Sequence, residues 1–437
     1  MNWKSRTALA LALLALLGLV IAGCGGSSGG TSDSDGSEGK LSGTVHIWDT
    51  TYESFPGYTK VMNKLDAEFE KENPGVTIER EAQPLETYES LVRSAFASHE
   101  GPDIMQMESG ALGVLSFDQG LEPLNERITA PMSEQITGWN TVTEDYAEEG
   151  ERFGVPVGLI GYVFYYNKAL FKKAGLPEKF EPKTWGDVKA AAEKLKAAGI
   201  EPFTAGNGEG YENIWWFSAG FHSLDDPQAE KELAEGTLDW TSPTVAKAFQ
   251  PQIEMEEAGL FPKDRFSSSA FSEGFPSFAE GKGAMVIGFW NTAGYWGEFN
   301  PKLGEKNVGM FFTPGPESVE TATTLALTIP SFAKNKNAAW AVIEYDSSKK
   351  AIEALVDEAG FMPNRTDVDV PSDAPVQETE LVDAAREREN VVAPAYMTPS
   401  PVVFGPLAKG ISEVLQGRIP LSEAQEQMQE AVEKTAP

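Results

Sequence analysis

Cysteine and histidine are scarce in this sequence. The 437-residue chain has one cysteine, Cys24, and three histidines that lie far apart, His46, His99 and His222. A single cysteine excludes an internal disulfide and a zinc site built from several thiolates. Three dispersed histidines lack the ligand spacing of a histidine-rich metal site. We therefore expect no metal and no other cofactor.

Positive charge is also in short supply. The chain has 35 Lys and Arg residues against 66 Asp and Glu, a formal net charge of −31 at pH 7. Nucleic-acid binding needs a basic face, so we exclude nucleic acid as a partner. The same excess of acids excludes attraction to anionic lipid by charge. An acidic surface keeps an exported protein soluble, and it is equally typical of a salty habitat.

Long apolar runs are missing after the N-terminus. The run from Leu9 to Cys24 follows Lys4 and Arg6, and it is shorter than the roughly twenty residues of a membrane-spanning helix. A basic start, a short apolar centre and small residues before a break indicate an export signal. The end, Ile21-Ala22-Gly23-Cys24, resembles the bacterial lipobox. The resemblance implies that residues 1–23 are a signal peptide and that Cys24 carries diacylglycerol, a stable membrane anchor.

A polar tether and an alternating pattern follow. Residues 24–39 are rich in glycine, serine and acids after the cysteine, which predicts a flexible tether. Beyond Leu41, strand and helix patterns alternate over Thr44–Trp48, Lys60–Glu72, Val76–Glu79, Tyr88–Ser98 and Pro102–Met107. Such alternation predicts an α/β fold with a parallel sheet under helices. Thr184 and Asp187 fit a capping box at the start of a further helix.

Several short motifs occur in the order typical of one family. They are Phe69–Val76, Gly101–Ile104, Val155-Pro156, Tyr166–Leu176, Thr184-Trp185, Phe278–Met285 and Leu415–Gly417. From Gly43 to Lys434 the chain resembles the extracellular solute-binding proteins, family 1, of carbohydrate-uptake ABC importers. The resemblance implies a type II periplasmic-binding-protein-like fold, with two α/β lobes and the ligand in the cleft between them.

The resemblance also implies how the chain is divided and what it does. Lobe one takes residues 40–157 plus 323–364, and lobe two takes residues 158–322 plus 365–437. A monomeric lipoprotein on the outer face of the cell membrane would capture a sugar or oligosaccharide and deliver it to ABC permease subunits, without catalysis. Two alternatives stay open: a membrane-anchored extracellular glycosidase, or the same fold with a glycerol phosphodiester or a peptide as ligand.

Sugar rings lie on aromatic faces, and their hydroxyls need polar partners, which directs the choice of site residues. Trp290 and Asn291 follow the apolar run 283–288, which reads as a buried strand. The family commonly has a stacking tryptophan there. Of the adjacent Trp215 and Trp216, we expect Trp215 to line the cleft and Trp216 to lie in the core.

The remaining candidates follow from the loops that face the cleft in the family. Tyr52 and Glu53 come after the first strand, and Glu108 and Ser109 come after the third. Arg365 lies at the expected third crossover, where it would either bind two hydroxyls or form a surface ion pair. Tyr211 and Phe404 complete the predicted ligand-binding residues.

Overall fold

The computed structural model describes residues 40–53, 56–108, 120–142, 150–290, 295–388, 390–398 and 402–435. The described residues from Leu41 onward belong to one compact unit, Leu41–Pro437, which is the second of two units in the chain. The predicted signal peptide, Cys24 and the tether lie outside the described residues. Within the described residues, no helix combines the length and the apolar character needed to cross a membrane.

One sheet runs through the second unit. Its nine strands, within the described residues, have the order β2-β1-β3-β8-β4-β6-β5, with β7 paired to β4 and β9 paired to β8. The strands are β1 (Gly43–Asp49), β2 (Val76–Ala82), β3 (Ile104–Glu108), β4 (Gly154–Asn167), β5 (Glu201–Phe203), β6 (Gly283–Trp290), β7 (Val308–Phe311), β8 (Val319–Thr328) and β9 (Asn390–Val392). β1 pairs in parallel with β2 and β3, as the alternating pattern predicts.

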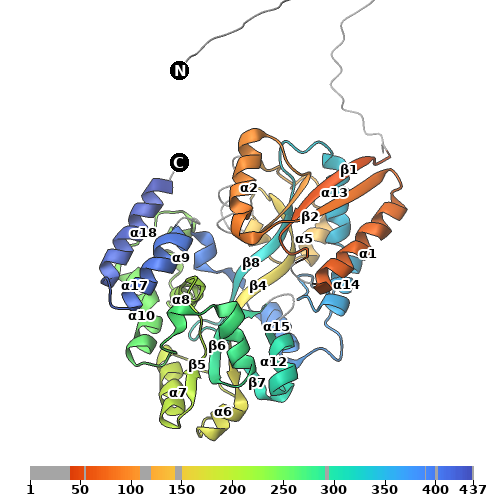
Figure 1. The fold of residues 1–437 in the computed structure, drawn as a ribbon. Coiled ribbons are helices and arrows are strands. Elements are labelled where there is room, and N and C mark those ends of the chain that lie inside the picture. The colour runs from red at the N-terminus through yellow and green to blue at the C-terminus, as the bar shows by residue number, and fades with distance from the viewer. Residues whose placement is uncertain are drawn as a thin grey trace, which may run out of the picture. The chain divides into compact units, whose positions relative to one another are not determined.

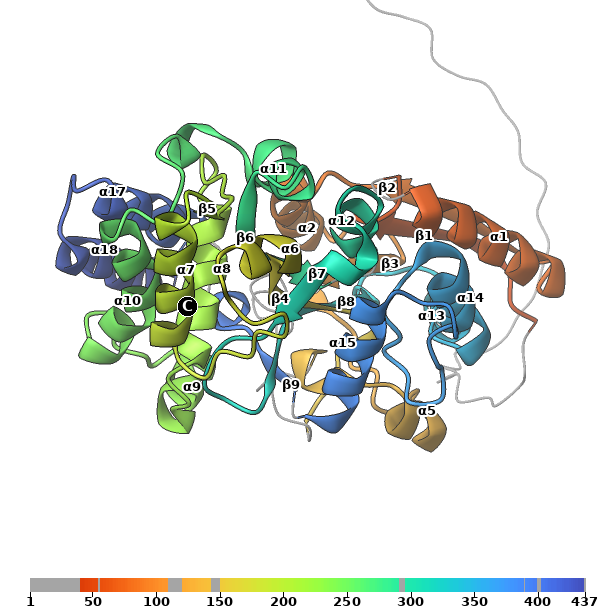
Figure 2. The same ribbon diagram turned by 90° about the horizontal axis from the view of Figure 1, so that it is seen from below.

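Helices cover the strands in two groups (Figures 1 and 2). Lobe one has α1 (Pro56–Glu72), α2 (Leu85–Ser98), α5 (Ala130–Gln135), α13 (Lys336–Asp346) and α14 (Lys349–Ala359). Lobe two has α6 (Lys168–Lys173), α7 (Trp185–Ala197), α8 (Tyr211–His222), α9 (Pro227–Ala234), α10 (Pro243–Glu257), α11 (Phe275–Ala279), α12 (Tyr295–Leu303), α15 (Val376–Glu387), α17 (Ile411–Leu415) and α18 (Leu421–Thr435).

The predicted capping box shows how local sequence sets a helix end. The Thr184 hydroxyl accepts a hydrogen bond from the Asp187 N–H at 3.2 Å, and the Asp187 carboxylate accepts one from the Thr184 N–H at 2.9 Å. The first backbone N–H groups of a helix lack the usual intrahelical acceptors, and these two bonds supply acceptors at the start of α7. The prediction is confirmed.

β4 and β8 are shared by two separate hydrophobic cores, and Figure 1 shows both strands passing between the two groups of helices. In β4, Val155 and Val157 belong to the core of lobe one, whereas Tyr162 belongs to the core of lobe two. In β8, Val319 belongs to the core of lobe two, whereas Leu325 belongs to the core of lobe one. The predicted lobe boundary at 157/158 lies between Val157 and Tyr162, and the one at 322/323 lies between Val319 and Leu325. The exact boundaries stay predictions.

Candidate ligand-binding site

Five aromatic side chains from four elements meet in lobe two. Tyr211 and Trp215 come from α8, Phe271 from the π-helix η3 (Ala270–Gly274), Phe275 from α11, and Phe404 from the π-helix η6 (Val403–Gly410). We call this group the aromatic surface. Trp215 stacks on Phe275 with ring centroids 5.9 Å apart and on Tyr211 at 6.3 Å. Phe271 and Phe404 meet Tyr211 edge-on, at 5.7 Å and 6.2 Å.

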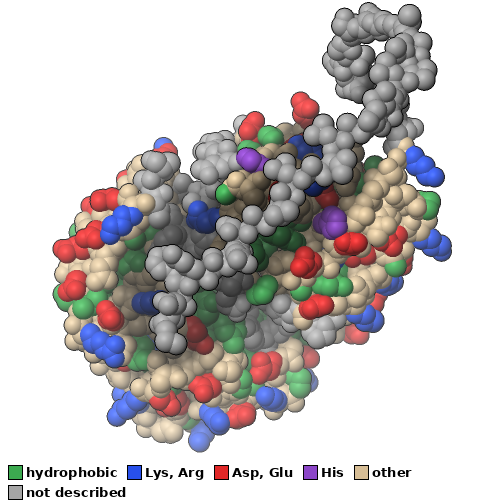
Figure 3. Space-filling view, turned by 45° about the horizontal axis from the view of Figure 1, so that its top comes forward, with side chains coloured by type: hydrophobic (Ala, Val, Ile, Leu, Met, Phe, Trp, Pro, Cys, Tyr) green, Lys and Arg blue, Asp and Glu red, His purple; other side chains and the backbone are tan. Residues whose placement is uncertain are grey.

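The outer members of the aromatic surface are open to solvent. Phe271 is 46% exposed and Phe404 51% exposed, while Trp215 behind them is only 1% exposed. On the face drawn in Figure 3, hydrophobic side chains gather in a hollow, and charged side chains lie mostly around it. Apolar rings left in water at one place are a candidate binding surface, because their burial by a ligand is favourable.

Glycine at one position allows the elements of the aromatic surface to approach each other. Gly210 precedes α8 with a φ of +83°, in the left-handed region that glycine adopts without strain. A Cβ at this position would lie 2.7 Å from the carbonyl oxygen of Ala408 in η6. The close contact places the start of α8, with Tyr211, against the helix that carries Phe404.

Asn213 ties the same elements together by hydrogen bonds. Its side-chain amide donates to the Ala408 carbonyl at 2.6 Å and to the Ser412 hydroxyl at 2.8 Å. Its carbonyl accepts from Asn207 at 2.8 Å and from Gln252 at 2.9 Å. Asn213 is fully buried, so these bonds replace those it would make to water.

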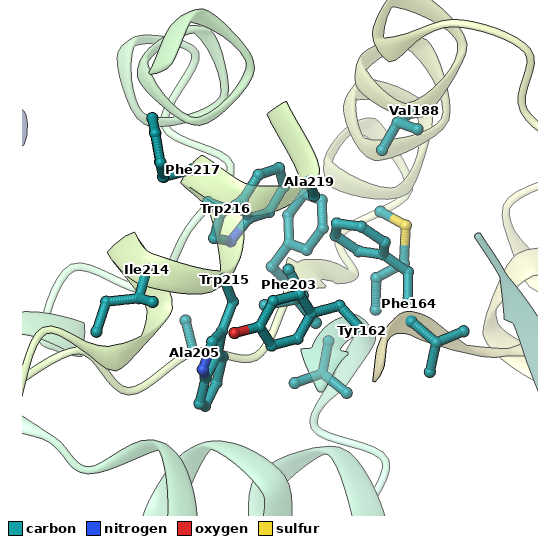
Figure 4. Close-up of a cluster of buried hydrophobic side chains, with 14 of the residues drawn as sticks. Tyr162, Phe164, Val188, Phe203, Ala205, Ile214, Trp215, Trp216, Phe217 and Ala219 are labelled. Carbon is teal, nitrogen blue, oxygen red and sulfur yellow. The ribbon is translucent and has the colours of Figure 1, made fainter. Parts of the chain in front are cut away.

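The two adjacent tryptophans point in different directions, as Figure 4 shows. Trp216 packs against Phe164 at 5.2 Å and Phe203 at 5.7 Å, inside the core of lobe two. Trp216 lies in the core as predicted, but Trp215 is equally buried and belongs to the same core. Trp215 belongs to the aromatic surface, but its 1% exposure makes it a support for Tyr211 and Phe271. Direct contact of Trp215 with a ligand stays a prediction.

Lobe one presents Tyr52 and Glu53 in the loop after β1. The Asp49 carboxylate accepts hydrogen bonds from the N–H of Thr51 at 2.8 Å and of Tyr52 at 2.9 Å, which shapes this loop. The Tyr52 hydroxyl donates to Asn63. Glu53 is exposed and has a φ of 64°. A residue other than glycine held in this region stores strain, which is common at functional loops.

A buried charge cluster under this loop was not predicted. The Arg80 guanidinium, 2% exposed, lies 3.1 Å from Asp49, 2.8 Å from Asp66 and 3.0 Å from Asp346. Burial raises the pKa of Asp346 to about 7, and the charge of Arg80 opposes the rise. Sequence reasoning had no signal for the cluster, because its members come from four separate elements.

Arg365 has a structural role in this fold. Its guanidinium donates to Asp367 at 2.8 Å and 3.0 Å, to the Ser347 carbonyl at 2.9 Å and to Gln135 at 2.6 Å. Arg365 is 7% exposed and the side chain of Asp367 is 28% exposed, so the predicted ion pair is present, with the carboxylate partly open to solvent. Because four of its five N–H groups are engaged within the protein, we leave Arg365 out of the proposed site.

The other predicted residues are placed only in part. Trp290 ends β6 opposite Gly161 of β4, so the predicted strand is confirmed, but its side chain lies outside what the structure describes. The same holds for the side chain of Glu108, the last residue of β3. Ser109 and Asn291 lie wholly outside the described residues. All four stay predictions.

A cavity elsewhere contains none of the predicted residues. It has a volume of about 580 Å³ and is lined by Glu256, Lys263, Asp264, Phe266, Ser267, Leu415, Gln416 and Arg418. Its one aromatic side chain, Phe266, is already covered by the Arg265 guanidinium, 4.6 Å from the ring centre. We therefore favour the aromatic surface. No metal-binding group of three or more His, Cys, Asp or Glu side chains occurs in the described part of the chain.

Known proteins resemble this chain over large parts of its length. A family model described as bacterial extracellular solute-binding protein matches residues 52–353. An uncharacterized ABC transporter extracellular-binding protein of Pyrococcus horikoshii is 22% identical over 402 residues, 90% of this chain and 87% of that protein. The sn-glycerol-3-phosphate-binding periplasmic protein of Brucella abortus is 30% identical over 209 residues, 44% of this chain and 45% of that protein.

A solved structure confirms the predicted fold. A chitin oligosaccharide binding protein superimposes with a TM-score of 0.78 at 21% identity, covering 90% of this chain and 98% of the other. The predicted two-lobe, periplasmic-binding-protein-like α/β fold is therefore correct.

Proposed function

Because this chain belongs to the bacterial extracellular solute-binding protein family, we propose that it captures a neutral sugar or oligosaccharide for an ABC importer. The similarity to an ABC transporter binding protein and to a chitin oligosaccharide binding protein supports this proposal. The permease subunits in the membrane would be its protein partners. The closed, loaded form would be the one that docks on them.

The observation that carries the proposal is the aromatic surface with its exposed Phe271 and Phe404. The C–H faces of a sugar ring are apolar and fit aromatic rings, which bury much area with little loss of conformational freedom. The five members bring no positive charge. A phosphate group needs Arg, Lys or backbone donors, so the aromatic surface favours a neutral ring over a glycerol phosphodiester.

Capture would depend on closure of the two lobes. A ligand shifts the equilibrium only by binding one state more tightly than the other. Contacts from the aromatic surface of lobe two and from the Tyr52-Glu53 loop of lobe one would be made together only in the closed state. No step of this cycle breaks a bond, so we propose a binding protein and not an enzyme.

The direct test is calorimetry with chitin oligosaccharides, stachyose, xylo-oligosaccharides and sn-glycerol 3-phosphate. We expect a neutral sugar to bind with micromolar affinity, about 8 kcal/mol, and to be recovered intact by mass spectrometry. Cleaved products would support the glycosidase alternative. If glycerol 3-phosphate binds and none of the sugars does, the proposal of a neutral sugar is wrong and an anionic ligand takes its place.

Anchoring through Cys24 is a separate proposal, because it concerns residues that the structure does not describe. Two acyl chains on Cys24 would hold the protein at the membrane surface. Expression of wild type and Cys24→Ala in a bacterial host, followed by membrane fractionation, tests it. We expect wild type with the membranes and Cys24→Ala lost from the anchored fraction. Equal membrane retention of both would contradict lipidation.

A further inference from the structure

The first turn of α8 contains a buried carboxylate, which is too deep to contact a ligand directly. Glu212 follows Tyr211 of the aromatic surface directly, yet its side chain is only 2% exposed. One oxygen accepts a hydrogen bond from the Gly206 N–H at 2.9 Å. The other lies 3.4 Å from the Arg265 guanidinium. A buried charge is kept only where such partners offset its loss of hydration.

Arg265 connects this carboxylate to the segment that leads to Phe271. It begins the 3-10 helix η2 (Arg265–Ser267), has no exposed surface, and lies 2.8 Å from Glu256 of α10. Its ring neighbours are Phe261 and Phe266, 4.0 Å and 4.6 Å from the guanidinium. Its carbonyl accepts the Asn207 N–H at 2.6 Å.

The loop before α8 and the segment before η3 are in backbone contact. Asn207 forms an isolated antiparallel bridge with Ser269, and the Gly208 N–H donates to the Ser268 carbonyl at 2.8 Å. A Cβ on Gly206 would lie 2.3 Å from the Ser269 carbonyl carbon. Phe271 follows two residues after Ser269, so a shift of this loop relative to η2 would move Phe271 relative to Tyr211.

We propose that Glu212 is a positioning residue for carbohydrate binding: held between Gly206 and Arg265, it sets the spacing of the two aromatic elements, α8 and η3. The inference rests on the proposed function of the aromatic surface. Glu212 touches no ligand itself. It acts through the loop and through η2, which join the two faces that a sugar ring would bridge.

The charge state of Glu212 changes near neutral pH. Burial raises the pKa of Glu212 to about 7, while the charge of Arg265 and the Gly206 N–H oppose the rise and nearby Glu209 adds to it. Glu256 faces the same guanidinium from α10. Ionised Glu212 binds Arg265 by charge, whereas protonated Glu212 leaves Arg265 to Glu256. Sugar affinity should therefore rise as the pH rises through 7.

The test compares wild type, Glu212→Gln and Glu378→Gln across pH 5.5 to 8.5, with the sugar that binds most tightly in the calorimetric panel. Glu378 is a matched control, because burial also raises its pKa to about 7 and it lies in α15, outside the aromatic surface. We expect wild type and Glu378→Gln to gain at least threefold in affinity over this range. Glu212→Gln should stay at the low-pH affinity throughout. A Glu212→Gln profile equal to that of wild type overturns the proposal.

A measurement without sugar separates this inference from the proposed function. Hydrogen exchange at pH 8 should be faster in Glu212→Gln for peptides covering residues 204–210 and 265–275, and unchanged for peptides of lobe one. Unchanged exchange in both segments overturns the positioning role even if a sugar binds. If exchange is faster but no sugar binds, Glu212 does hold the two segments together as inferred. That outcome would count against the proposed function instead.

Discussion

At the scale of single residues, two phenylalanines differ from the other aromatic side chains of the described residues. Phe271 and Phe404 leave about half of their side-chain area in water, although lobe two has a large aromatic core that could bury them. Keeping apolar area in water costs about 25 cal/mol per Å². A ligand that covers both rings recovers this free energy, which is the physical basis for assigning them a binding role.

Phe271→Ala should weaken sugar binding about tenfold, or 1.4 kcal/mol, by removing one exposed face. Val376→Ala is the matched control, because Val376 is a 41% exposed apolar residue of α15 that lies outside the aromatic surface. Calorimetry with the same sugar checks both variants. Equal affinity for wild type and Phe271→Ala would exclude Phe271 from the site, whereas equal losses in both variants would point to a general effect of surface hydrophobicity.

At the scale of elements, the site depends on close approaches between backbone segments. The loop between β5 and α8 meets the segment before η3 so closely that only glycine fits at position 206. The obstacle there is backbone, which cannot rotate away as a side chain can. Lobe one has a comparable arrangement, in which Asp49 at the end of β1 organises the loop with Tyr52.

Gly206→Ala should displace the loop from Ser269 and cost on the order of 1–3 kcal/mol of stability, as overpacking does. It should also weaken sugar binding, because η3 carries Phe271. Gly236→Ala is a useful comparison for strain: its φ is +68°, but a Cβ there would meet no atom within 4 Å. Thermal unfolding and calorimetry check the pair. A Gly206→Ala protein with wild-type stability and affinity would show that the contact is easily relaxed.

At the scale of the whole molecule, charge and its burial determine the response to pH. Burial raises the pKa of Glu212, Asp346 and Glu378 to about 7, well above the ordinary carboxyl value. A carboxyl group with a raised folded pKa takes up a proton more readily in the folded state. Its stabilising contribution is complete below the unfolded pKa and is lost as the pH rises through the folded pKa.

The free energy of unfolding should therefore fall between pH 5 and pH 8. Glu378→Gln should reduce this slope and raise the melting temperature at pH 8 by a few degrees, because a buried neutral amide replaces a buried charge. Thermal unfolding from pH 5 to 8 at constant salt measures both effects. A wild-type melting temperature that rises over this range would contradict the raised pKa values of the buried carboxyl groups.

The pH range stops at 5 because other carboxylates respond in the opposite sense at lower pH. Ion-paired carboxylates such as Glu68 and Glu358 have a lowered pKa, and their contribution to stability is lost in acid.

The family resemblance predicted the family and the two-lobe fold, and the apolar patterns predicted several strands and helices. Of the five members of the aromatic surface, three were predicted as site residues, Tyr211, Trp215 and Phe404, and two were missed, Phe271 and Phe275. Phe271 stands among serines and an acid, in the sequence Ser267 to Glu273, which is a polar setting for a large ring. That setting is the one sequence signal that could have indicated its exposure.

The sequence by itself determined what depends on neighbours along the chain. Apolar spacing set the strands and helices, and Thr184 with Asp187 set a helix start, because these interactions span only a few residues. Only the tertiary structure decided which charges meet. Arg80 contacts Asp346, and Arg265 contacts Glu212, across separations that local patterns do not encode. The physical reason is that a buried charge is stable only beside its partner, and the fold alone brings the two together.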